Sequence, residues 1–113
     1  FCFANNISVC VPKVVENTLQ FYKIKSNHDL APAPFGLLEP NVTEMILVQR
    51  IDMMIVPLSS YDSKNHRTGY GKGYYDSVLL NCRNRIGVVF QEQEVDFIDV
   101  EPHDVTLDEI IVV

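Results

Sequence analysis

Three features are scarce in this sequence: basic residues, cysteines and long apolar runs. Its 113 residues hold nine Lys and Arg against fifteen Asp and Glu, a formal net charge of −6 at pH 7. Because binding to nucleic acid depends on an excess of Lys and Arg, this balance argues against a nucleic-acid partner. An anionic ligand must therefore be met by a local basic patch.

The few cysteines exclude a disulfide framework. Cys2, Cys10 and Cys82 are odd in number and lack the paired spacing of a zinc site, so we expect reduced, mostly buried thiols. Three histidines are equally isolated, and we predict no metal ligand among them: His28, His66 and His103. No apolar run approaches transmembrane length and no signal peptide is visible. We therefore expect a cytoplasmic protein without a membrane partner, with an organelle form left open.

Residues 67–76 carry the strongest functional signal. They read Arg-Thr-Gly-Tyr-Gly-Lys-Gly-Tyr-Tyr-Asp, with three glycines at alternate positions. Because glycine has no Cβ, the backbone can take positive φ and a ligand can approach its amide groups closely. An apolar run (residues 53–57) precedes this stretch and helix-compatible residues (77–81) follow it, which predicts a strand, a glycine loop and a helix. A glycine loop at a helix N-terminus suits a phosphate group.

Charged and aromatic side chains in this loop extend the phosphate hypothesis. The fork of Arg67 can bind two phosphate oxygens, and Lys72 adds a point charge. A carboxylate beside phosphate is repelled unless a divalent cation lies between them. Asp76 is therefore either a magnesium ligand or a first-turn acid that complements the helix dipole. Three tyrosines offer flat faces to a planar heterocycle, although at least one is expected to pack under the loop: Tyr70, Tyr74 and Tyr75.

Neither familiar nucleotide fingerprint is present. A P-loop needs Gly-Lys followed by Ser or Thr, whereas Lys72 is followed by Gly73. In the dinucleotide motif the third glycine stands one residue later than it does here.

The loop instead closely resembles the Arg-x-Gly-x-Gly-x-Gly-Tyr-Tyr-Asp signature of the 5-formyltetrahydrofolate cyclo-ligase family. Residues 35–40 resemble that family's Phe-Gly-Ile-x-Glu-Pro segment, residues 51–57 are similar to its central strand, and Asp104 falls where it has a second acid. The family usually has Gly where this chain has Leu58, which is a departure. Asn65 also replaces a Gly, but Asn is the next most tolerant residue of the left-handed region.

The resemblance implies an enzyme that uses Mg-ATP to convert 5-formyltetrahydrofolate to 5,10-methenyltetrahydrofolate, with release of ADP and phosphate. Catalytic charge neutralisation is implied for Arg67 and Lys72, and magnesium binding for Asp76 and Asp104. The implied ATP-binding residues are Arg67, Thr68, Gly69, Tyr70, Gly71, Lys72, Gly73, Tyr74 and Tyr75. The implied folate-binding residues are Tyr70, Gly71, Lys72, Gly73 and Tyr74. No side chain need act as a nucleophile, because the folate supplies both.

The predicted fold class is α/β, a three-layer sandwich with a mainly parallel (Rossmann-like) sheet. The fully apolar residues 53–56 suit a central parallel strand covered on both faces. We predict further strands at residues 7–11, ending at Pro12, and at 19–24, as an edge strand. Two more apolar strands follow at 86–90 and 107–113, whereas residues 41–49 could be helix or extended.

The length predicts one domain, residues 1–113, and we expect a monomer. The chain begins at Phe1 and ends inside an apolar run, so we expect a fragment or a processed piece. The resemblance implies the C-terminal two-thirds of the family's domain. Two alternatives to an active enzyme stay open: a non-catalytic folate- or nucleotide-binding relative, and an inactive truncated remnant whose loop only packs.

Overall fold

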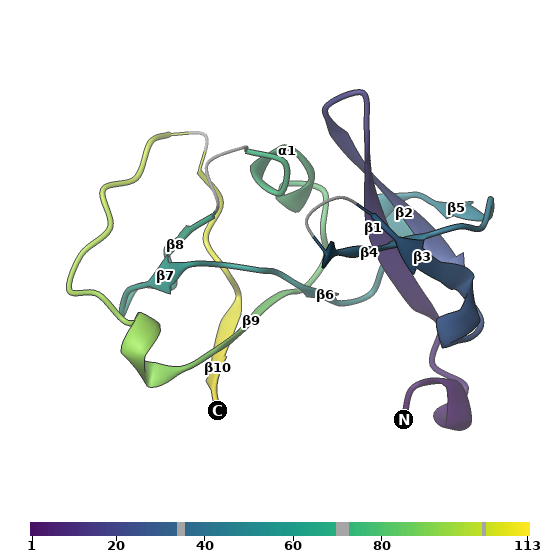
Figure 1. Ribbon diagram of the computed structural model, residues 1–113. Coiled ribbons are helices and arrows are strands. Elements are labelled where there is room, and N and C mark those ends of the chain that lie inside the picture. Colours follow the sequence, from purple (N-terminus) through teal and green to yellow (C-terminus); the bar gives the residue numbers. More distant parts are fainter. Residues whose placement is uncertain (34–35, 70–72, 103) are drawn as a thin grey trace. The chain divides into compact units, whose positions relative to one another are not determined.

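The computed structural model describes residues 1–33, 36–69, 73–102 and 104–113. The chain divides into two compact units, Phe1–Arg50 and Ile51–Val113. Each unit has its own small sheets (Figure 1). The prediction of one domain stays a prediction.

The first unit is built on an antiparallel hairpin. β1 (Val9–Val15) pairs along its whole length with β2 (Thr18–Ile24), and β2 also pairs with the short β5 (Met45–Ile46). The turn residues Glu16 and Asn17 have φ of 50° and 64°, the left-handed conformation that matches the twist of a tight hairpin. A second small sheet pairs β3 (Leu30–Pro32) with β4 (Leu38–Pro40). Among the described residues of this unit, 3₁₀ turns are formed by η1 (Phe3–Asn5), η2 (Asn27–Asp29) and η4 (Val48–Arg50).

Two predictions about this unit are wrong. The first strand does not stop at Pro12 but continues through it, with Pro12 opposite Phe21. Proline is tolerated there because β1 is the outer strand of the order β1-β2-β5, where one side of the backbone needs no partner. In the same strand order β2, which was predicted to be an edge strand, is the central strand, and its Phe21 and Ile24 are buried.

The second unit contains a parallel sheet. β6 (Met54–Ile55), β9 (Arg85–Val89) and β10 (Glu109–Val112) lie in the order β10-β9-β6, with both pairings parallel (Figure 1). β7 (Ser60–Tyr61) and β8 (Arg67–Thr68) form an antiparallel hairpin. The helix α1 (Asp76–Leu79) follows the glycine loop, and the 3₁₀ turn η5 (Gln91–Gln93) follows β9.

The strand predicted to be central is an edge strand in the part of the chain that the structure describes. β9 lies in the middle, and the side chain of Ile55 in β6 is 56% exposed. The apolar character of residues 53–56 instead reflects Met54 and Val56, which are both buried. The predictions of strands at 86–90 and 107–113 are confirmed by β9 and β10.

The centre of the second unit is packed closely around Gly87 of β9. A Cβ atom at Gly87 would lie 2.9 Å from Leu107 Cδ1 and 3.0 Å from Leu58 Cδ2. Both leucines are buried, as are Val56, Leu79 and Val89. Leu58, the departure from the cyclo-ligase pattern, therefore has a defined place in the core.

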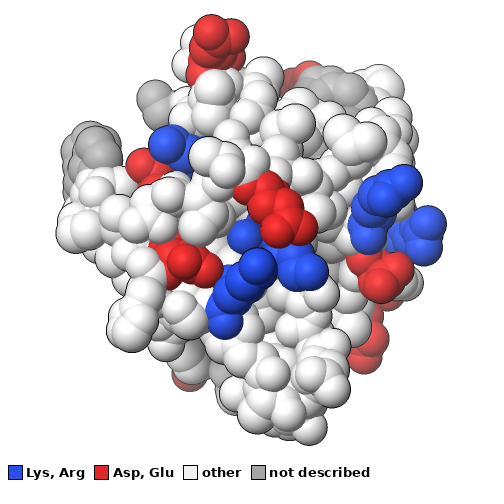
Figure 2. All heavy atoms as spheres, turned by 90° about the vertical axis from the view of Figure 1, so that its right-hand side faces the viewer, with Lys and Arg blue, Asp and Glu red and all other residues white. Residues whose placement is uncertain are grey.

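The described residues combine a parallel sheet, antiparallel sheets and a short helix, which confirms the α/β class. The three-layer arrangement stays a prediction. Of the cysteines, which are all free, Cys82 is buried and Cys2 and Cys10 are partly exposed, so the expectation of mostly buried thiols is wrong. No helix in the described ranges is long and apolar enough to cross a membrane. On the face in Figure 2, the described Lys and Arg side chains are mixed with Asp and Glu side chains.

Candidate functional site

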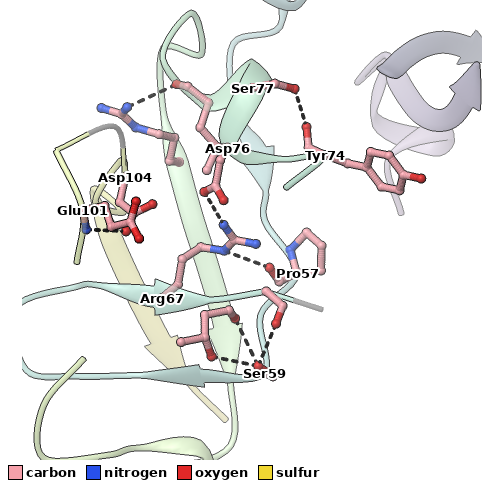
Figure 3. A network of polar contacts seen from close by, with 12 residues as sticks. Pro57, Ser59, Arg67, Tyr74, Asp76, Ser77, Glu101 and Asp104 are labelled. Atoms are coloured by element: carbon pink, nitrogen blue, oxygen red, sulfur yellow. Dashed lines mark hydrogen bonds and ion pairs between the residues drawn. The ribbon is translucent and has the colours of Figure 1, made fainter. Parts of the chain in front are cut away.

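Arg67 is the most firmly placed of the predicted site residues. It begins β8, opposite Tyr61 of β7, and its side chain is only 5% exposed. Arg67 Nε donates a hydrogen bond to the carbonyl oxygen of Pro57 at 3.1 Å, and Nη1 donates to Asp76 Oδ1 at 3.0 Å (Figure 3). The guanidinium is thus held from two sides, by the end of the β6 segment and by the first residue of α1.

The hairpin that carries Arg67 is closed by a tight turn and a hydroxyl cluster. Asn65 has a φ of 64°, in the left-handed region that Asn tolerates better than most residues other than Gly. Thr68 Oγ1 is hydrogen-bonded to the hydroxyl oxygens of Ser59, at 2.8 Å, and Ser60. The predicted ATP-binding residue Thr68 is therefore engaged in holding the two strands together.

The first and last glycine positions of the loop, Gly69 and Gly73, each favour glycine, but for different structural reasons. A Cβ atom at Gly69 would lie 2.6 Å from Arg67 Nη2, so a side chain there would displace the guanidinium. Gly73 has a φ of +70°, which favours glycine at that position. The predictions for Tyr70, Gly71 and Lys72 lie outside the described residues.

The residues after the loop lead into a helix shorter than expected. α1 spans four residues, Asp76–Leu79, and Tyr75 before it already has helical dihedral angles. So short a helix carries only a small dipole, so the predicted dipole contribution to phosphate binding has little structural support. Burial raises the pKa of Tyr75, and the nearby charge of Arg67 partly opposes that shift. The ring of Tyr74 points away from the Arg67–Asp76 pair (Figure 3).

Asp76 and Asp104, far apart in the sequence, line one pocket together with Arg67. The pocket has a volume of about 50 Å³, and its other lining residues are His66, Val100, Val105 and Thr106. Asp104 Oδ2 accepts a hydrogen bond from the backbone N–H of Glu101 at 2.8 Å, which fixes the carboxylate in its loop (Figure 3). A space of this size has room for an ion or a few water molecules beside a phosphate group, not for a whole nucleotide.

The two carboxylates that line this pocket, Asp76 and Asp104, are compatible with the ligand chemistry of magnesium. No group of three or more His, Cys, Asp or Glu side chains suited to a metal occurs among the described residues. Zinc and calcium sites usually take more protein ligands, whereas magnesium is commonly held by one or two carboxylates with water and substrate phosphates. Asp76 and Asp104 supply such a pair of carboxylates beside a cationic side chain.

Sequence reasoning missed a second polar pair in the same region. Asp62 is 3% exposed and accepts a hydrogen bond from His66 Nδ1 at 2.9 Å. Burial by itself would raise the pKa of Asp62, but hydrogen bonds from His66, Lys64 and Ile98 outweigh it and lower the pKa. The available signal was the stretch Asp62-Ser63-Lys64-Asn65, in which an Asp is followed by polar residues and an Asn. Such a stretch is typical of a turn that is capped by the Asp side chain.

These features define the second unit as an α/β structure in which Arg67, Asp76 and Asp104 line one pocket. Comparison with known proteins makes the assignment specific. The chain belongs to the 5-formyltetrahydrofolate cyclo-ligase family, whose sequence model matches residues 2–113.

Individual relatives agree with this assignment. A 5-formyltetrahydrofolate cyclo-ligase from Mycoplasma pneumoniae is 33% identical over 115 residues, covering 98% of this chain and 59% of that protein. One from Haemophilus influenzae is 36% identical over 84 residues, covering 69% of this chain and 45% of that protein. The NMR structure of Aquifex aeolicus 5,10-methenyltetrahydrofolate synthetase matches with a TM-score of 0.83 at 27% identity, over 98% of this chain and 57% of that chain. The chain thus spans about half the length of these relatives.

Proposed function

We propose that this chain takes part in the ATP-dependent cyclisation of 5-formyltetrahydrofolate to 5,10-methenyltetrahydrofolate, with release of ADP and phosphate. The observation that carries this proposal is the pocket in which Arg67, Asp76 and Asp104 meet beside the glycine loop. One buried guanidinium group and two carboxylates are the groups that a magnesium-bound phosphate chain requires.

In this proposal, residues 67–75 bind ATP, and residues 70–74 also face the folate. The Arg67 guanidinium is held by Pro57 and Asp76, so little side-chain freedom is lost when it binds a phosphate oxygen. Lys72 adds a second positive charge on the loop. Asp76 and Asp104 would hold Mg²⁺, which would neutralise charge on the phosphates during transfer.

The proposed chemistry uses the substrate's own nucleophiles. The formyl oxygen attacks the γ-phosphorus, ADP leaves, and a phosphorylated imidate results. The position-10 nitrogen then adds to the activated carbon, and phosphate leaves as the ring closes. Phosphoryl transfer of this kind depends mainly on positioning and charge neutralisation, which the fixed guanidinium of Arg67 is suited to provide.

The wider features of the proposal follow from the family likeness and the composition. We infer a cytoplasmic monomer with folate and ATP as its small-molecule partners and with no nucleic-acid partner. We also infer one domain, with a three-layer arrangement around a mainly parallel, Rossmann-like sheet. The parallel β10-β9-β6 sheet supports that arrangement.

The test is the rise in methenyltetrahydrofolate absorbance when the protein is mixed with 5-formyltetrahydrofolate and Mg-ATP. Asp76→Ala is expected to lower kcat/KM by roughly 100-fold or more, because a magnesium ligand and the partner of Arg67 are both lost. Asp52→Ala is the matched control, since Asp52 is 88% exposed and outside the pocket, and it is expected to keep full activity.

Direct titration of Mg-ATP and folate separates the other outcomes. Binding without turnover would identify a non-catalytic relative. A folded protein that binds neither ligand would identify a structural remnant and reject the proposed function.

A further inference from the structure

We propose that His66 is a further ligand-binding residue of the pocket, positioned by Asp62 so that its imidazole contacts a phosphate oxygen of the nucleotide. This inference rests on the proposed function, because it assumes that the pocket receives the phosphates of Mg-ATP. Position 66 lies outside the glycine-loop signature of residues 67–76.

The first supporting observation is the rigidity of the Asp62 carboxylate. Asp62 Oδ1 accepts backbone hydrogen bonds from Lys64 at 3.0 Å and His66 at 3.1 Å. Oδ2 accepts from the backbone of Ile98 at 3.1 Å and is 2.9 Å from His66 Nδ1. A buried carboxylate with four contacts cannot turn to follow a moving partner, so it fixes the ring that it binds.

The second observation is where the ring lies. The His66 side chain is 18% exposed, and the residue lines the same pocket as Arg67, Asp76 and Asp104. Because Nδ1 faces Asp62, Nε2 is on the opposite edge of the ring. Nε2 is therefore the ring atom positioned to serve a ligand in the pocket.

The chemistry of the pocket favours a donor at that position. The pocket is lined by one positive side chain, Arg67, and by two carboxylates, Asp76 and Asp104. A phosphate group that enters with one magnesium ion is therefore bound more tightly if the pocket offers a further N–H donor. In this role Nδ1 stays on the Asp62 carboxylate, and Nε2 is the ring nitrogen left to contact a phosphate oxygen.

The same carboxylate joins both walls of the pocket. Through its own turn Asp62 holds the hairpin that carries Arg67, and through the Ile98 N–H it holds the segment that leads to Asp104. The Asp62–His66 pair therefore both positions the pocket and contributes to its lining.

The experiment measures binding of Mg-ATP and of magnesium tripolyphosphate by calorimetry to the unaltered chain and to three variants. His66→Phe keeps a ring but removes both nitrogens, and His66→Gln keeps an N–H donor. His28→Phe is the matched control, because His28 is exposed and lies in η2 of the first unit. We expect His66→Phe to weaken both ligands by the same factor, about 10-fold or more, as for one charge-assisted hydrogen bond. His66→Gln should recover much of that loss, and His28→Phe should bind as the unaltered chain does.

A merely structural role would give a different pattern. It would weaken folate binding together with ATP binding, whereas the proposed contact raises KM for ATP and leaves KM for 5-formyltetrahydrofolate unchanged. If His66→Phe does not fold, His66→Ala takes its place in the same comparison. If folded His66→Phe binds both ligands as the unaltered chain does, the inference about His66 is wrong, while the proposed function still stands. The same conclusion follows if His66→Phe loses affinity for Mg-ATP but not for magnesium tripolyphosphate. An unaltered chain that binds no Mg-ATP overturns the proposed function and this inference together.

Discussion

At the residue scale, the orientation of Arg67 depends on the planar shape of its guanidinium. One nitrogen donates to Pro57 and another to Asp76, in directions that a single ammonium group cannot serve together. With the side chain 5% exposed, neither contact is easily replaced by water. The site therefore requires the shape of this residue as well as its charge.

Arg67→Lys is expected to reduce kcat/KM with Mg-ATP by about 100-fold while the protein remains folded, because removing one fixed donor from a developing charge has an effect of that order. Steady-state kinetics and thermal unfolding measure the two properties. Arg83→Lys is the matched control, since Arg83 is 63% exposed and forms only a surface ion pair. A fully active Arg67→Lys variant would show that charge alone suffices.

Gly69→Ala tests the close approach between Gly69 and Arg67. The new Cβ would lie 2.6 Å from Arg67 Nη2, so the guanidinium must move and lose a contact. We expect a modest loss of stability, about 1 kcal/mol, together with a large loss of ATP binding. In an Arg67→Ala background the same change should have almost no effect on stability or binding. Equal effects of Gly69→Ala in both backgrounds would reject the steric explanation.

At the element scale, the strands of the second unit depend on close packing at Gly87. Leu58 and Leu107 occupy the space that any larger residue at position 87 would need. This arrangement explains how the chain accommodates Leu58. The leucine side chain fills space over the central strand β9.

Leu58→Ala is expected to lower the free energy of unfolding by about 2–5 kcal/mol, because it opens a cavity beside β9 in a rigid core. Urea unfolding measures the change. Leu80→Ala is the control for the same substitution at a site that is 76% exposed, where the expected change is within about 0.5 kcal/mol. Equal destabilisation by the two variants would contradict the packing described here.

At the element scale, the sequence predicted some strands of the second unit but not the order of the strands in either unit. The runs that became β9 and β10 are apolar and β-branched, so local composition was enough to identify them. Strand order was predicted wrongly for β2 and β6, because the partners that place a strand in the middle of a sheet are distant in sequence. The β7–β8 hairpin was not predicted, since its pairing depends on hydroxyl and turn contacts and not on an apolar pattern.

The candidate site shows the same limit. The pattern of residues 67–76 predicted a phosphate loop with Arg67 and Asp76, and those two side chains do meet. Asp104 was assigned through a family likeness, because no spacing rule relates it to Asp76. The Asp62–His66 pair was missed because it depends on the left-handed turn at Asn65, which local residue type only suggests.

At the scale of the whole molecule, buried and hydrogen-bonded carboxylates determine the response to acid. The pKa of Asp62 is lowered by its hydrogen bonds despite burial, and the pKa of Asp108 is lowered by hydrogen bonds from Arg85, chiefly from its backbone N–H. A lowered pKa means that folding favours the ionised form. The stabilisation is therefore present above the unfolded value of 3.8 and is lost as the pH falls through the lower folded value.

We therefore expect the free energy of unfolding to be nearly constant from about pH 7 to pH 5 and to fall below about pH 4. Asp62→Asn should be less stable at pH 7 and should show a weaker dependence below pH 4, because its amide cannot titrate. Denaturant unfolding at a series of pH values provides the measurement, with the exposed Asp52→Asn as control. An acid profile that is identical in Asp62→Asn and in the unaltered protein would remove Asp62 from this account.

The parallel sheet has one more consequence, for the handling of the protein. Ile55, Val88 and Ile111 are 56%, 45% and 43% exposed, and their registers in β6, β9 and β10 place them on one face. At neutral pH the net charge of −6 keeps copies apart by repulsion. As acid removes that charge, the apolar faces of separate copies can associate. The protein should therefore aggregate at a pH above the one at which it unfolds. Concentrated stocks are therefore best kept slightly alkaline and low in salt, and a charged residue in place of Ile55 should extend their shelf life.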